Sequence, residues 1–214
     1  MSCSGIPPAV TDYENAYWDE HPDGVLCGID EVGRGPLAGP VVACAVTMPR
    51  RWLNCRCQLI GLTDSKKLTA LRREEFCRRL EAMPEVHFAL GWVSAAEIDE
   101  INILQATYRA MSLAVKALPR LPDHALVDGN PVKGLPCAST AIVKGDAKSF
   151  LIAAASVIAK VHRDRFMDEL DTRYPGYGFA RHKGYGTAAH CAALSRLGSC
   201  PEHRRSFKPV SDIQ

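Results

Sequence analysis

Short apolar runs alternate along the chain with longer segments of helical periodicity. A run of about four to eight apolar residues predicts a buried strand. Such runs occupy residues 25–29, 41–46, 86–93, 124–127 and 140–143. Between the first two runs, Pro36, Gly39 and Pro40 exclude a helix. We therefore expect the first two strands to be neighbours joined by a tight loop.

Three longer segments carry apolar residues at helical spacing, and they predict helices over residues 69–83, 94–118 and 147–174. Strands that first form a hairpin and then alternate with helices indicate an α/β fold with a mixed sheet flanked by helices. The residues after Pro175 lack clear strand signals. We expect them to form a helical or irregular C-terminal region.

The length of 214 residues suits a single domain over residues 1–214, with its core at about 25–174 and the C-terminal region at about 175–207. No apolar run approaches the roughly 20 residues that cross a bilayer, so we expect no membrane association. The nine cysteines are scattered, and Cys55 and Cys57 are too closely spaced for the usual zinc pair. We expect a cytoplasmic monomer with reduced thiols.

Charge is unevenly distributed, although the net charge is only +2. Residues 12–23 carry acidic side chains without a lysine or arginine, whereas basic residues predominate after Thr172. The basic residues in question are Arg173, Arg181, Lys183, Arg196, Arg204, Arg205 and Lys208. A basic C-terminal region favours a polyanionic partner. A solvated surface without a partner is the alternative.

Four carboxylates lie near the ends of predicted strands: Asp30, Glu31, Asp128 and Asp146. Two unit charges 4 Å apart repel by about 4 kcal/mol at an effective dielectric near 20. If the acids converge, several must be protonated or must bind cations, and all-oxygen ligands suit Mg²⁺ or Mn²⁺. Solvated charges are the simpler alternative for the first pair. A nucleotide-hydrolase strand is excluded because the chain has no glycine-rich Gly-Lys-Ser/Thr loop.

Several motifs, in matching order and spacing, closely resemble those of ribonuclease HII. The motifs are Gly-Ile-Asp-Glu-Val-Gly-Arg-Gly from residue 28, Asp-Ser-Lys-Lys-Leu from 64, Val-Asp-Gly-Asn from 127, Lys-Gly-Asp-Ala-Lys from 144, and His-Lys-Gly-Tyr-Gly-Thr from 182. The resemblance extends from about Val25 to Phe207 and implies a ribonuclease H-like fold. It also implies hydrolysis 5′ of a ribonucleotide, leaving 3′-hydroxyl and 5′-phosphate ends. The implied substrates are RNA–DNA hybrids and duplex DNA with embedded ribonucleotides.

The resemblance also assigns roles to residues. It implies that Asp30, Glu31, Asp128 and Asp146 are catalytic ligands of Mg²⁺ or Mn²⁺, with two ions during catalysis. Substrate contacts would come from Gly33, Arg34, Gly35 and Tyr185, the last stacking on the sugar at the junction. Ser65 and Lys66 are candidate phosphate contacts, with an ordinary solvated turn as the alternative. The family often has proline where Gly186 stands, a departure that could loosen this loop.

Other polar residues are expected to be structural. Lys160, Arg163 and Asp164 lie on the longest predicted helix and suggest ion pairing, and we do not assign His182 or His190 as metal ligands. Two other functions are alternatives. Ribonuclease HIII carries an extra N-terminal substrate-binding domain, for which residues 1–24 are expected to leave no room. A non-catalytic nucleic-acid-binding module would not need all four acids.

Overall fold

The computed structural model describes residues 11–54, 59 and 61–213. Its elements are α1 (Asp12–Glu20), β1 (Leu26–Val32), β2 (Val41–Thr47), α2 (Arg51–Asn54), η2 (Ser65–Lys67), α3 (Ala70–Glu81), β3 (His87–Val93), α4 (Ala95–Lys116), β4 (His124–Asp128), β5 (Ala138–Ile142), η3 (Gly145–Ala147), α5 (Phe150–Arg173), α6 (Phe179–His182), α7 (Ala188–Leu197) and η4 (Val210–Asp212). The predictions for Cys55 and Cys57 lie outside the described residues.

The strands form one five-stranded sheet in the order β3-β2-β1-β4-β5. β1 pairs with β2 and β2 with β3, both antiparallel, so the predicted hairpin is confirmed. β4 lies parallel to β1, and β5 lies parallel to β4. The carboxyl ends of these three parallel strands meet at one edge, which is where open α/β sheets place their ligand sites. The predicted mixed α/β architecture is confirmed.

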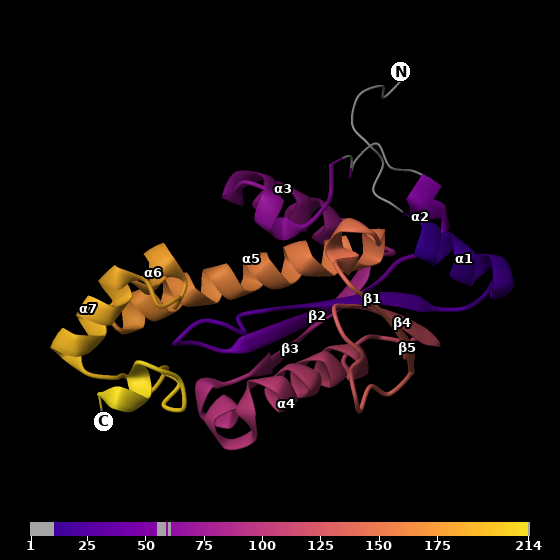
Figure 1. The fold of residues 1–214 in the computed structure, drawn as a ribbon. Coiled ribbons are helices and arrows are strands. Elements are labelled where there is room, and N and C mark those ends of the chain that lie inside the picture. Colours follow the sequence, from indigo (N-terminus) through magenta and orange to yellow (C-terminus); the bar gives the residue numbers. More distant parts are fainter. Residues whose placement is uncertain (1–10, 55–58, 60, 214) are drawn as a thin grey trace.

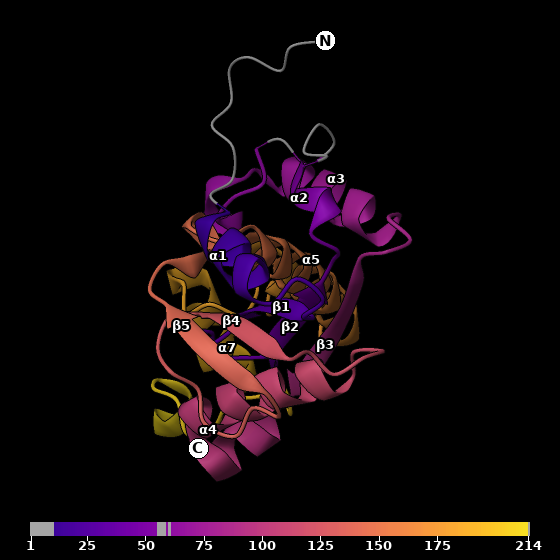
Figure 2. The same cartoon turned by 90° about the vertical axis from the view of Figure 1, so that its right-hand side faces the viewer.

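Helices cover both faces of the sheet: α5 and α3 lie on one face and α4 on the other (Figure 1). The view turned by 90° shows the same layers, with the strands between α5 and α4 (Figure 2). On β1, a Cβ at Gly28 would lie 2.3 Å from the main-chain carbonyl carbon of Leu151. The glycine therefore lets α5 approach the central strand closely, beside the acids at the end of that strand.

The C-terminal region is helical and irregular, as predicted. α6 packs against α5, and α6, α7 and the C-terminal turns gather at one end of the molecule (Figure 1). Within the described part of the chain, no helix is both long and apolar enough to span a membrane.

Three local features differ from the sequence-based expectation. The acidic segment near the N-terminus forms α1, which was not predicted. A short 3₁₀ turn, η3, precedes α5, so that helix begins at Phe150 rather than Ala147. The predicted helix over 94–118 is interrupted at Asn102, which has a φ of 65°. The Asn102 carboxamide accepts the N–H groups of Leu104 and Gln105, and thereby caps the second part of α4.

Candidate active site

Three aspartates from separate elements meet at the carboxyl edge of the parallel strands. Asp30 lies on β1, Asp128 ends β4 and Asp146 lies in η3. Each offers one carboxylate oxygen, and these three atoms lie within 4.8 Å of one another. The main-chain N–H of Gly145 donates to Asp128 Oδ1 at 2.6 Å, which holds η3 against the end of β4. Three of the four acids selected from the sequence therefore lie together.

The electrostatics of the cluster favour a cation. Burial raises the pKa of Asp30 well above its usual value, and the charges of Glu31 and Asp128 add to the shift. Burial also raises the pKa of Asp146, again with a contribution from Asp128. Closely spaced buried carboxylates become stable as anions when a cation binds between them. The donors are all oxygen atoms, so these residues fit Mg²⁺ or Mn²⁺.

Glu31 lies beside this cluster but outside the group of three oxygens. Its Oε1 pairs with Arg34 Nη1 at 3.2 Å. Burial raises the pKa of Glu31 although Arg34 opposes the shift, and the charge of Asp128 contributes to the rise. The Glu31 N–H donates to Asp30 Oδ1 at 2.7 Å, which fixes the first carboxylate beside the strand. Glu31 could complete a metal site from this position.

Lys66 provides positive charge beside the acids. Burial would lower the pKa of Lys66, but the charge of Asp30 and those of three further aspartates together raise it. The three are Asp64, Asp128 and Asp146. Because the Lys66 ammonium group lies close enough to interact with these carboxylates, it can bind an anionic group of the substrate at the same edge of the sheet.

Ser65 differs from its predicted role. Its side chain is buried, and its Oγ hydrogen-bonds with Ser156 Oγ on α5 at 2.8 Å. Ser156 also hydrogen-bonds to Asp30 and opposes the rise in its pKa. Ser65 therefore supports Asp30 through Ser156, and this geometry disfavours the Ser65 side chain as a phosphate contact. Ser156 was not predicted as a site residue, although its small size was a signal that α5 approaches the sheet.

Asp64 is a second residue that the sequence-based assignment missed. Its carboxylate accepts the Lys66 N–H at 2.8 Å and caps η2. It also raises the pKa of Asp146, through both its charge and a hydrogen bond. Asp64 stands in the Asp-Ser-Lys-Lys-Leu motif, but it does not follow a predicted strand, so the strand-end rule did not select it.

The remaining predicted contacts lie on two adjoining loops. Gly33 has a φ of +90°, and a Cβ there would lie 2.2 Å from Arg163 Nε. A Cβ at Gly35 would lie 3.7 Å from Tyr185 Cε1, so the two loops touch at this point. The side chains of Tyr185 and Arg34 are exposed by 43% and 50%, respectively, and are accessible to a large ligand.

Two buried arginines hold these loops together. Arg163 on α5 donates to the main-chain carbonyls of Ala38, Pro40 and Lys183. Arg204 donates to the carbonyls of residues 33, 34 and 39. Burial lowers the pKa of Arg163 to about 10 and that of Arg204 to about 9, so both stay charged at neutral pH.

Two predictions are corrected by these contacts. The Arg204 side chain is fully buried, so its predicted contact with a polyanion is wrong; the neighbouring Arg205 is exposed. Arg163 binds main-chain carbonyls rather than a carboxylate, so its predicted ion pairing is also wrong. The ion pair of Lys160 with Asp164, at 2.6 Å, is confirmed. A charge pattern along the sequence cannot tell a buried guanidinium from a solvated one.

Comparison with known proteins identifies the family. The ribonuclease HII family model matches residues 27–210. The ribonuclease HII of Shouchella clausii is 55% identical over 185 residues, or 86% of this chain and 69% of the relative. That of Chlorobium chlorochromatii is 53% identical over 199 residues, or 92% of this chain and 95% of the relative.

Solved structures agree. The crystal structure of ribonuclease H2 from Pyrococcus horikoshii has a TM-score of 0.74 at 26% identity, and the match covers 88% of this chain and 96% of the Pyrococcus chain. The structure of Bst-RNase HIII in complex with Mn²⁺ has a TM-score of 0.65 at 20% identity, and the match covers 88% of this chain and 68% of the Bst-RNase HIII chain. At this identity, the similarity shows a shared fold alone. The chain therefore belongs to the ribonuclease HII family and is an endoribonuclease of the ribonuclease H class.

Proposed function

We propose that the chain hydrolyses the phosphodiester 5′ of a ribonucleotide, both in RNA–DNA hybrids and at single ribonucleotides embedded in duplex DNA. The products would carry 3′-hydroxyl and 5′-phosphate ends. The observation that supports this most directly is the meeting of Asp30, Asp128 and Asp146 at one sheet edge, with their oxygens within 4.8 Å. Structural roles alone do not account for this cluster, in which burial and the charge of Asp128 raise the pKa values of Asp30 and Asp146.

Asp30, Asp128 and Asp146, with Glu31 beside them, would hold Mg²⁺ or Mn²⁺, the latter being the ion bound in the Bst-RNase HIII structure. Two such ions would activate water and stabilise the leaving oxygen in phosphodiester cleavage. Ser156 fixes the Asp30 carboxylate, and the Gly145 N–H fixes that of Asp128. Both carboxylates are thus oriented before substrate arrives.

The two adjoining loops would select the ribonucleotide. The 2′-hydroxyl is both donor and acceptor, and it distinguishes RNA from DNA. Gly33 and Gly35 would present main-chain groups to it, the exposed Tyr185 ring would lie against the sugar, and Arg34 would contact the backbone. Lys66 would bind the phosphate beside the acids.

The described cysteines are unpaired, which supports our proposal of a cytoplasmic location.

The decisive experiment uses end-labelled duplex DNA with one ribonucleotide and its all-deoxy twin, each with Mg²⁺ or Mn²⁺. We expect a single cut 5′ of the ribonucleotide and none in the twin. Asp128→Asn should abolish cleavage and leave duplex binding intact, whereas Asp212→Asn, which changes an exposed acid in η4, should cleave normally. Cleavage of the all-deoxy duplex, or full activity of Asp128→Asn, would refute the proposal.

A further inference from the structure

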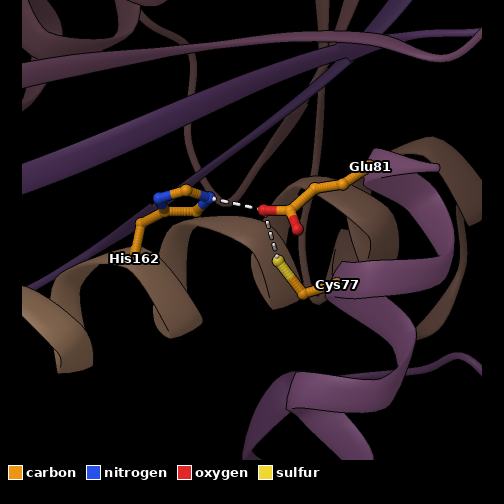
Figure 3. Close-up of side chains that lie close together, drawn as sticks. All are labelled: Cys77, Glu81 and His162. Carbon is orange, nitrogen blue, oxygen red and sulfur yellow. Dashed lines mark hydrogen bonds and ion pairs between the residues drawn. The ribbon is translucent and has the colours of Figure 1, made fainter.

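A second group of potential metal ligands lies between α3 and α5. Cys77 and Glu81 come from the last turns of α3, and His162 comes from the middle of α5. Figure 3 shows the three side chains pointing toward one another across the gap between the helices. One sulfur, one oxygen and one nitrogen atom lie within 4.8 Å of one another. None of these residues belongs to the proposed catalytic site.

The Glu81 carboxylate is the centre of the group. Its Oε1 lies 3.4 Å from Cys77 Sγ and 3.1 Å from His162 Nε2. Zinc–ligand bonds of about 2.0–2.3 Å at tetrahedral angles separate neighbouring ligand atoms by about 3.4–3.6 Å. The distances from Glu81 to Cys77 and to His162 therefore match the ligand separations of a tetrahedral zinc site within a few tenths of an ångström. The third distance, between the ligand atoms of Cys77 and His162, is no longer than 4.8 Å.

The chemistry of the donors distinguishes this group from the aspartates. Thiolate and imidazole ligands select zinc and its neighbours over magnesium, which prefers oxygen. We propose that Cys77, Glu81 and His162 form a zinc site, with water as the fourth ligand. On binding, the Cys77 proton leaves to solvent, and Glu81 and His162 Nε2 each supply a lone pair. A thiolate and a carboxylate then neutralise the charge of the ion.

The surroundings allow such a site. The Cys77 sulfur lies in the core, whereas Glu81 and His162 are partly exposed, with 30% and 25% of their side-chain surfaces accessible. A water ligand can therefore reach the outer side of the group. Arg165 Nη1 lies 3.9 Å from Glu81, but its closer partner is Glu74 at 2.6 Å. Arg165 can therefore keep its ion pair with Glu74 when a cation binds to Glu81.

Bound zinc would fasten α3 to α5. α3 begins three residues after Lys67, the end of the turn that carries Ser65 and Lys66. A bridge at the other end of α3 would limit movement of this helix relative to α5, which carries Ser156 and supports Asp30. The predicted effect is on rigidity and does not require the catalytic acids to participate.

Cobalt is a suitable probe because thiolate–Co²⁺ coordination gives a near-ultraviolet charge-transfer band that oxygen ligands do not. The full chain would first be stripped of bound metals and then supplied with excess Mg²⁺ before Co²⁺ is added. We expect the band to saturate at about one equivalent of Co²⁺. Zn²⁺ should then bleach it, because zinc binds such donors more tightly than cobalt. Absence of the band in the unmodified protein would overturn the proposal.

Variants identify the residues that give rise to the charge-transfer band. Cys77→Ala should abolish it, whereas Cys200→Ala, at another buried thiol that touches a histidine, and Asp128→Asn should retain it. His162→Gln keeps an N–H for Glu81 on a partly exposed surface, so it tests binding even if Cys77→Ala fails to fold. It should raise the Co²⁺ concentration at half-saturation at least about tenfold. A band that survives Cys77→Ala, disappears in Asp128→Asn, or is unaffected by His162→Gln would contradict the assignment.

Discussion

The Nε2 atoms of His190 and His203 lie 3.1 Å apart in the interior of the C-terminal region. His190 Nδ1 faces the Tyr185 carbonyl at 2.9 Å and must therefore carry a proton. His190 Nε2 is then the acceptor, and His203 Nε2 donates to it. His203 Nδ1 in turn accepts the main-chain N–H of Cys200 at 3.0 Å. This chain of hydrogen bonds requires two neutral rings, and it holds the main chain at Tyr185.

Acid should weaken the fold through this pair. Burial lowers the pKa of His203 to about 4, and the charge of His190 adds to the effect; the pKa of His190 is lowered for the same main reason. Between the ordinary value of 6.5 and about 4, the unfolded chain binds protons that the folded chain does not. The free energy of unfolding should therefore fall over this range, by up to about 3 kcal/mol from His203.

NMR titration of the imidazole protons and urea unfolding from pH 7 to 4 measure these effects. The raised pKa values of Asp30 and Glu31 act in the opposite direction. His203→Asn isolates the histidine contribution, because its stability should decline less steeply than that of the unmodified protein. A midpoint above pH 6 for both buried rings would contradict the tautomers inferred above.

Neighbouring arginines should have opposite phenotypes. Arg204→Lys replaces a five-donor fork by one ammonium and leaves buried carbonyls unpaired, so we expect a loss of about 3 kcal/mol in unfolding free energy. Arg205→Glu should change stability by less than about 0.5 kcal/mol but weaken binding to every duplex and flatten its salt dependence. Urea unfolding and salt-dependent binding measure the two effects. Equal loss of stability in both variants would argue against the distinction.

Removing one acid should not destabilise the metal-free protein. Asp146→Asn relieves repulsion with Asp128, so its melting temperature without metal should equal or exceed that of the unmodified chain. Mg²⁺ at about 100 times its dissociation constant should stabilise the unmodified protein by about 2.7 kcal/mol, and the variant by less. Thermal unfolding with and without Mg²⁺ is the measurement. A strongly destabilised variant together with no response to Mg²⁺ would indicate a structural role for Asp146.

Tyr185 should matter most where only one ribose is available. Tyr185→Ala should lower kcat/KM at an isolated ribonucleotide more than in a continuous RNA tract, because neighbouring riboses in the tract offer alternative registers. Tyr185→Phe keeps the ring beside Gly35 and should preserve the ratio of the two constants. The ratio is measured for all three proteins under identical metal and salt conditions. An equal loss on both substrates after Tyr185→Ala would assign the residue to general binding.

Local patterns predicted much of this molecule. Apolar runs located the strands, and the strand-end rule selected Asp30, Asp128 and Asp146 before their convergence was visible. Contacts between distant segments were not predictable in this way. Glu14, within the acidic N-terminal segment, is fully buried and accepts hydrogen bonds from Ser149 Oγ and the Leu151 N–H, at the start of α5. Nothing in the spacing of acidic residues separates this cap from a solvated charge.

The main-chain anchoring of residues 33–40 makes the shape of this loop independent of the Arg34 side chain. Arg163 and Arg204 grip the loop through its carbonyl oxygens, which every amino acid provides. The side chain of Arg34, half exposed above these anchors, can therefore be exchanged without moving the backbone that carries it. For protein engineering, this makes Arg34 a favourable position to randomise in a search for nucleases with altered contacts to the substrate backbone, because the main chain of the loop stays in place.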